Sequence, residues 1–157
     1  MRIAARGSVV VLLAITIGGG STGALAQQPS VTGLWLDNEG RGAVEITRCD
    51  RSLCGRIVWL KDPADKDGKP WNDMLNPIPS QRETPVCGLQ VLGELKRETD
   101  GNWTGGWIYD PEQGRRFNVE VSIKDANALT VYGYDKDKVK SETMNWTRLP
   151  DSSPRCK

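Results

Sequence analysis

Four cysteines are the residues best suited to covalent chemistry in this 157-residue sequence: Cys49, Cys54, Cys87 and Cys156. Cysteines pair as disulfides in oxidising compartments or act as thiolate ligands of zinc. Cys49 and Cys54 flank a turn between two strand-like runs, so they face each other across a hairpin. This favours a Cys49–Cys54 bridge and, by elimination, a Cys87–Cys156 bridge. Zinc sites usually have two closely spaced pairs, which favours disulfides over zinc here.

Histidine is absent from the sequence, which excludes Ser–His–Asp and Cys–His nucleophiles and His-ligated metal sites. Any general acid or base would therefore be Asp, Glu, Lys, Tyr or Cys. Asp110 and Glu112 form the best-placed pair of carboxylates, but in a tight turn such groups usually accept hydrogen bonds from backbone N–H groups. The sequence predicts a protein that is not an enzyme and holds no metal and no cofactor.

Residues 62–86, called the rim loop below, contain five prolines and no periodic pattern. A connection this long without regular structure is usually functional or disordered. Its polar turn around Asp65 and Asp67 fails as an EF-hand, because Pro63 and Met74 would occupy ligand positions. A looser oxygen site using Asp62, Asp65, Asp67 and Asp73 is the alternative to a solvated turn, and the solvated turn is favoured.

The segments that must position these residues all resemble strands, since none has a sustained helical period. We expect eight of them, over residues 32–37, 42–49, 54–61, 87–96, 102–110, 115–124, 128–135 and 139–149. Short strands joined by short turns imply antiparallel neighbours. Closing the sheet removes its exposed edges, so the pattern predicts one all-β domain, an eight-stranded antiparallel up-and-down barrel over residues 32–149. A two-sheet sandwich is the alternative.

The first and last strands carry residues suited to closing that barrel. Gly33 and Trp35 form a Gly-x-Trp on the first strand, and Arg148 lies near the end of the last. A guanidinium stacked on the indole would be a cation–π contact worth roughly 0.5–2 kcal/mol. We therefore predict that Arg148 stacks on Trp35 and joins the two strands.

Six tryptophans against one phenylalanine is an unusual balance. We expect Trp35, Trp107 and Trp146 in the core, with Trp107 facing inward like Trp35 in a similar hairpin. Trp71 and Trp103 are the best candidates for exposure. Because exposed indoles stack on sugars while Asp and Asn bond hydroxyls, the candidate ligand contacts in the rim loop are Trp71, Asn72, Asp73 and Asn76.

The first 26 residues have the order of a secretory signal peptide: Arg2 and Arg6, an apolar run, and a small-residue cleavage site at residues 24–26. Residues 27–31 would be a short extension and residues 150–157 a C-terminal tail. The apolar run is too short to span roughly 30 Å of hydrocarbon, so we expect no integral membrane segment after cleavage. With 21 basic and 20 acidic residues, the chain lacks the charge pattern of nucleic-acid binding.

Several stretches together resemble the bacterial exported family known as domain of unknown function 2147. They are "GLWLDNEGRGAVEITRC", "LCGRIVWLK", Asn76-Pro77, "PVCGL", "GGWIYDPEQGRRF", "VYGY" and "NWTRL". They follow one another across nearly the whole mature chain, and the C-terminal tail lies outside them. The resemblance implies a lipocalin-like or calycin-like small barrel of the bacterial envelope and implies no activity.

Taken together, these features lead us to expect a periplasmic or secreted barrel that binds a small, partly apolar molecule, with the rim loop across its opening. The alternative is an envelope module that binds a glycan or a protein through its surface and the rim loop. The sequence does not specify the ligand or the oligomeric state.

Overall fold

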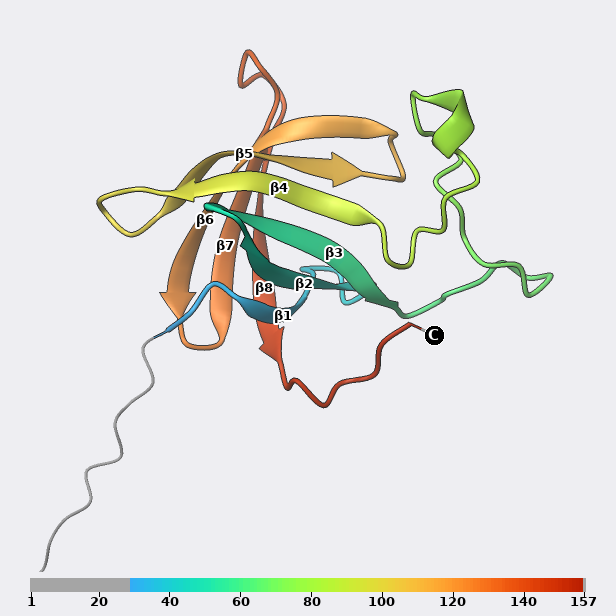
Figure 1. Ribbon diagram of the computed structural model, residues 1–157, viewed down its shortest axis with the longest axis horizontal. Coiled ribbons are helices and arrows are strands. Elements are labelled where there is room, and N and C mark those ends of the chain that lie inside the picture. The colour runs from blue at the N-terminus through green and yellow to red at the C-terminus, as the bar shows by residue number, and fades with distance from the viewer. Residues whose placement is uncertain (1–28, 157) are drawn as a thin grey trace, which may run out of the picture.

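The computed structural model describes residues 29–156, so the predicted signal peptide over residues 1–26 lies outside the described residues. Eight antiparallel strands, neighbours in chain order, close into one barrel (Figure 1). The strands are β1 (Gly33–Leu36), β2 (Gly42–Cys49), β3 (Ser52–Leu60), β4 (Gln90–Arg97), β5 (Trp103–Asp110), β6 (Arg115–Asp125), β7 (Ala128–Tyr134) and β8 (Ser141–Leu149). The predicted all-β, up-and-down barrel is confirmed.

Alternation of side chains along each strand explains why these segments form a barrel. In β6, Val119 and Val121 are buried, whereas Asn118 and Lys124 are exposed, as expected for a strand with one face on the core. The last strand begins at Ser141, two residues later than predicted. Val139 instead belongs to the preceding turn, where its N–H donates to the Asp135 carboxylate at 2.9 Å.

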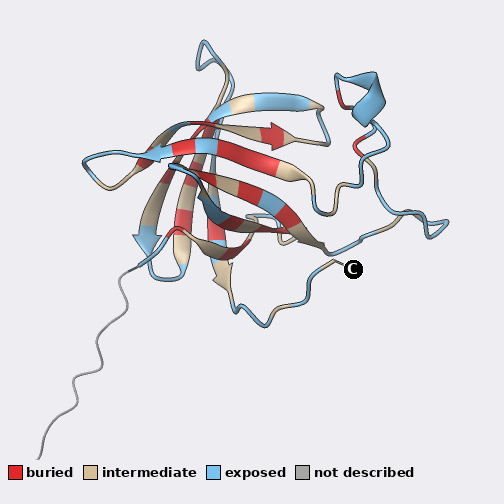
Figure 2. Cartoon of the chain, viewed as in Figure 1, coloured by how far each residue is buried: buried red, intermediate tan, exposed pale blue. Residues whose placement is uncertain are grey.

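The barrel closes where β1 pairs with β8, with Trp35 opposite Arg148 in the register. Buried side chains form the core at one end of the barrel, which we call the closed end. Figure 2 colours the buried residues red along the strands. The buried core residues that fill it are Trp35, Ile46, Leu53, Leu95, Trp103, Val121 and Leu129. The opposite end, called the mouth, is bounded by the rim loop and by the β1–β2, β5–β6 and β7–β8 turns.

Two predictions about tryptophans are wrong. Trp103 is only 7% exposed, because it pairs with the buried Val121 and faces the core. Trp107 does not face inward like Trp35. A bulge at Gly105, with φ +68°, interrupts the alternation of β5, and the half-buried indole packs over Gly93 beneath Arg116, on the outer face.

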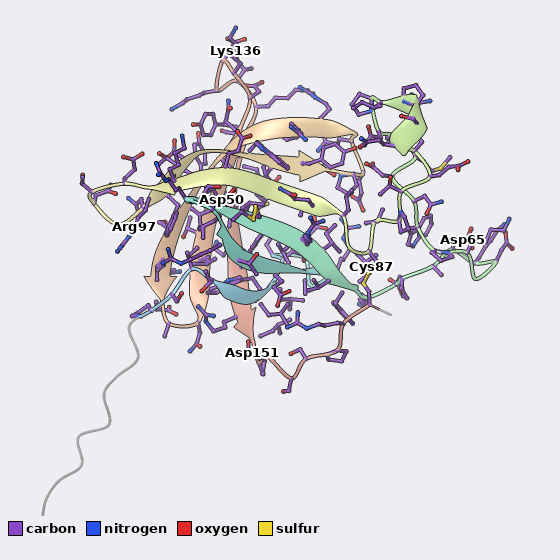
Figure 3. The ribbon with its side chains drawn as sticks, in the orientation of Figure 1. Asp50, Asp65, Cys87, Arg97, Lys136 and Asp151 are labelled. Carbon is purple, nitrogen blue, oxygen red and sulfur yellow. A yellow bond between two sulfur atoms is a disulfide. The ribbon has the colours of Figure 1, made fainter. Side chains whose placement is uncertain are left out.

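Disulfides join Cys49 to Cys54 and Cys87 to Cys156, as the sequence favoured. The first spans the β2–β3 hairpin at the closed end. The second attaches the tail to the residue that follows the rim loop, and Figure 3 shows Cys87 there. Beside it, the N–H of Cys156 donates to the carbonyl of Val58 at 2.6 Å, and Arg155 pairs with Glu45 at 3.0 Å. The tail is therefore fixed along the outside of β2 and β3.

The rim loop is ordered by local contacts rather than by strands. It contains one 3-10 turn, η1 (Pro79–Gln81), and lies beside the mouth at the right of Figure 1. Within its polar turn, Asp65 accepts hydrogen bonds from the N–H groups of Asp67 and Lys69, both at 2.9 Å. Across residues 29–156, the structure contains no helix with the length and apolar character needed to cross a membrane.

Candidate functional site: the barrel mouth and its rim loop

A cavity of about 1030 Å³ occupies the mouth half of the barrel. Its inner wall consists of apolar residues from seven strands, β2 to β8: Val44, Ile57, Val91, Ile108, Phe117, Gly133, Met144 and Trp146. Its outer edge is polar and includes Asp37, Glu39, Arg41, Asp62, Asp110, Glu112, Lys140 and Glu142. Such a site is suited to a molecule with an apolar body and some polar groups.

Small and flexible side chains leave this space open. Gly133 on β7 faces the interior, and a Cβ there would stand 3.7 Å from the Met144 methyl and 3.8 Å from Ile108. Those distances are ordinary van der Waals contacts, so a larger side chain at Gly133 would extend into the cavity. The closed end has large side chains at equivalent inward positions, which is why the cavity stops there.

Arg148 forms the floor of the closed end together with Trp35. Its guanidinium carbon lies 4.0 Å from the centre of the indole, which is the stack predicted from the sequence. The same group donates to the carbonyls of Ala126 at 2.7 Å and Thr32 at 3.1 Å, and also to that of Ser30. Gly33 leaves the space that this side chain occupies. One arginine thus connects the chain entry, the β6–β7 turn and the last strand.

Asp73 anchors the rim loop to the barrel. Its carboxylate is fully buried and accepts from the Tyr109 hydroxyl at 2.7 and 3.0 Å and from the Asn76 amide at 2.6 Å. Burial, followed by this hydrogen bond to Asp73, raises the pKa of Tyr109 to about 12. Nearby, the rim-loop backbone at Leu75 rests directly on Gly114, whose φ of +61° suits glycine.

An ion pair crosses between two turns of the mouth. Arg41 in the β1–β2 turn donates to both carboxylate oxygens of Glu112 in the β5–β6 turn, at 2.7 and 3.1 Å. Arg41 also pairs with Glu39. Hydrogen bonds to Glu112 and then to Glu39 raise the pKa of Arg41. The pair is well exposed, so it orients the turns more than it stabilises the fold.

The structure divides the four candidate ligand contacts of the rim loop into two groups. Trp71 and Asn72 line the cavity, and Trp71 is 49% exposed, as expected. The indole N–H of Trp71 donates to the Asp62 carbonyl at 3.0 Å, which fixes its orientation. Asp73 and Asn76 are buried beneath the loop and hold its shape. Contact of any of these residues with a ligand stays a prediction.

Sequence reasoning missed three features of the site: the Asp73–Tyr109 anchor, the Arg41–Glu112 pair, and the position of Trp146 in the cavity wall. It interpreted Asp110 and Glu112 as a turn-capping pair. Asp110 has that role, since its carboxylate accepts from the Glu112 N–H at 2.8 Å. Only the recurrence of an acidic turn in both mouth hairpins could have indicated that Arg41 and Glu112 face each other.

Comparison with known proteins agrees with this architecture. No curated protein matches the chain. A solved structure, protein HP1028 from the human pathogen Helicobacter pylori, is described as belonging to the lipocalin family. It has a TM-score of 0.66 and 23% identity, over 78% of this chain and 85% of that chain, which bears on the fold alone. A bacterial family matches residues 33–148, from β1 to β8, and the chain therefore belongs to the family described as "Uncharacterized protein conserved in bacteria (DUF2147)".

Proposed function

We propose that this protein is exported to the bacterial envelope and binds a small, partly apolar molecule in the mouth cavity, with the rim loop as a lid. The observation that carries the proposal is the cavity of about 1030 Å³, apolar inside and polar at its edge. Small-molecule sites commonly occupy about 300–1,000 Å³ and have this distribution of polarity. Eight-stranded barrels are wide enough to hold one small ligand where side chains do not fill the interior.

The two disulfides and the predicted signal peptide support an oxidising location, either periplasmic or secreted. The lipocalin description of the structural neighbour supports a binding role over catalysis. The best carboxylate pair supports the same choice, because Asp110 is engaged with its own turn and Glu112 with Arg41. Both groups are thus occupied by structural contacts.

Titration of the mature protein with N-phenyl-1-naphthylamine, an uncharged apolar dye that fluoresces when buried, tests the proposal. We expect saturable binding, and we expect Gly133→Phe to weaken it because the new ring would occupy part of the cavity. Thr130→Phe is the matched control, since Thr130 lies on the same strand facing outward. Equal binding by wild type and Gly133→Phe, or none by wild type, would contradict the proposal.

A second candidate is an interaction module for a glycan or protein of the envelope. Its support is the group of exposed apolar side chains on the rim loop: Trp71, Met74, Leu75 and Ile78, which are 49–63% exposed. Retention on peptidoglycan that is lost in Trp71→Ala, with dye binding intact, would favour this function. No retention, together with Trp fluorescence unchanged by muropeptides, would count against it.

A further inference from the structure

Trp146 has an indole N–H group without a partner in the cavity wall. The residue is 4% exposed and lines the cavity, and its buried Nε1 forms no hydrogen bond with any group in residues 29–156. Two other indoles in the described residues have partners: Nε1 of Trp35 donates to the Val31 carbonyl at 2.9 Å, and Nε1 of Trp71 donates to the Asp62 carbonyl. A buried donor left alone costs free energy, so native proteins rarely keep one without a role.

The surroundings of Trp146 restrict which acceptor this donor could receive. The inner wall, defined above by its eight residues from Val44 to Trp146, includes no charged side chain. A carboxylate inserted there would lose its hydration and gain a single N–H donor. One hydrogen bond does not offset the free energy of desolvating the charge. An uncharged carbonyl, in contrast, needs only one donor to be well satisfied.

The edge of the cavity also disfavours an anion. Its charged residues are Asp37, Glu39, Asp62, Asp110, Glu112 and Glu142 against Arg41 and Lys140. Arg41 is already paired with Glu39 and Glu112. An anionic head group lying in the mouth would therefore meet excess negative charge in the lining itself. Lysines of the neighbouring turns, such as Lys136 and Lys138, do not line the cavity.

We propose that the cavity selects uncharged acyl esters or amides over free fatty acids, with the ligand carbonyl accepting a hydrogen bond from Nε1 of Trp146. This inference rests on the proposed function. Met144 is the next inward residue of β8 towards the mouth, and its methyl lies 3.7 Å from the position that a Cβ on Gly133 would take. Because methionine is flexible, its displacement gives the ligand a route to the covered indole.

Competition against N-phenyl-1-naphthylamine on the wild-type protein gives the first test. Methyl octanoate and octanoate have the same acyl chain but differ in charge at neutral pH. We expect octanoate to bind at least about tenfold more weakly than the ester, because its charge is poorly accommodated both inside and at the edge. This comparison needs no variant, so it does not depend on whether a substituted protein folds.

Trp146→Phe gives the second test, since it keeps an aromatic ring and removes the N–H. We expect its affinity for methyl octanoate to fall about fivefold relative to its affinity for undecane, because undecane reports the change in ring size alone and the ester also loses one hydrogen bond. Trp103→Phe is the matched control, because Trp103 is a buried indole outside the cavity lining. It should leave both affinities unchanged.

Three outcomes would overturn the inference: octanoate binding as well as the ester, Trp146→Phe weakening ester and undecane equally, or Trp146→Phe leaving ester affinity intact. In each of these the dye still binds wild type, so the proposed function stands. If wild type binds neither dye nor ester, the proposed function itself has failed.

Discussion

The two ends of this barrel are built from the same eight strands but are held together differently. At the closed end, Arg148 stacks on Trp35 and donates to backbone carbonyls from the chain entry and the β6–β7 turn. At the mouth, contacts between side chains hold separate loops: Asp73 to Tyr109 and Arg41 to Glu112. Hydrogen bonds to backbone carbonyls hold the closed end together. At the mouth, each contact between side chains holds a different pair of segments and can break independently of the other.

The size of the inward side chains along one strand determines where the barrel interior is filled and where it is open. On β7, Leu129 and Val131 are fully buried in the filled half, whereas Gly133 lies in the cavity wall. On β8, Trp146 lies between the floor and the cavity, with Met144 nearer the mouth. β7 and β8 therefore keep one register along their length, and only their inward side chains distinguish the filled core from the cavity.

The largest expected effect comes from the disulfides, one at each end. Their sequence separations are 69 for Cys87–Cys156 and 5 for Cys49–Cys54. Replacing the longer bridge by serines should lower the free energy of unfolding by about 4 kcal/mol, and replacing the shorter one by about 2 kcal/mol, because a longer loop restricts the unfolded chain more. Urea denaturation measures both. Equal losses would contradict this ranking.

Arg148→Ala should have an effect between those of the two disulfides. It removes the stack on Trp35 and the bonds to the Ala126 and Thr32 carbonyls, so we expect a loss of about 3 kcal/mol of unfolding free energy. Dye affinity of the folded protein should change little, because Arg148 does not line the cavity. Arg148→Lys is the control for charge alone. Strongly weakened dye binding would mean that the two ends are coupled.

Tyr109→Phe should release the rim loop with little effect on the barrel. It leaves the buried Asp73 without one donor, at a cost of about 2 kcal/mol to the closed loop. Limited proteolysis within residues 62–86 would measure the opening. Unchanged protection of the loop would show that Leu75 on Gly114 is the main anchor.

The same contact predicts a response to alkali. Because folding raises the pKa of Tyr109 to about 12 from 10.0, its stabilising effect is complete below pH 10 and is lost as the pH rises through about 12. Loop cleavage by an alkali-tolerant protease should therefore increase across this range. Tyr109→Phe should lack that increase, and an identical profile in both proteins would assign it to another group.

Glu112→Gln should have the smallest effect, a change in unfolding free energy of under about 1 kcal/mol, because the Arg41–Glu112 pair is exposed. Thermal melts at low and high salt would measure it. Salt screens such pairs, so the two proteins should converge at about 1 M salt. A difference that persists at high salt would indicate a packing role for Glu112.

Much of the fold could be predicted because its signals are local. The alternation of Val119 and Val121, and the turn between Cys49 and Cys54, depend only on neighbouring residues. The Trp35–Arg148 stack followed from barrel closure, which brings the first and last strands together. The prediction for Trp107 was wrong because a single bulge at Gly105 reverses the faces on which the following side chains of β5 lie. The periodicity of the sequence does not reveal such a bulge.

The site was less predictable because its contacts join segments without periodicity. Asp73 lies in the rim loop, 36 residues from Tyr109, and no pattern connects them. The unpartnered indole of Trp146 is harder still to infer, since the lack of a partner depends on every neighbour of the ring. The sequence predicted that the rim loop matters and that Trp71 is exposed, but not how the loop is held.

The Cys87–Cys156 bridge has a consequence for refolding. Its two cysteines lie on either side of β4 to β8, and in the folded protein the bridge holds the tail along β3. Because the bridge joins the two ends of a segment that contains five of the eight strands, it restrains that segment even when the barrel is not formed. A chain in which this pair is oxidised therefore keeps its tail beside the residue that follows the rim loop, and refolding starts with the two ends of that segment already together.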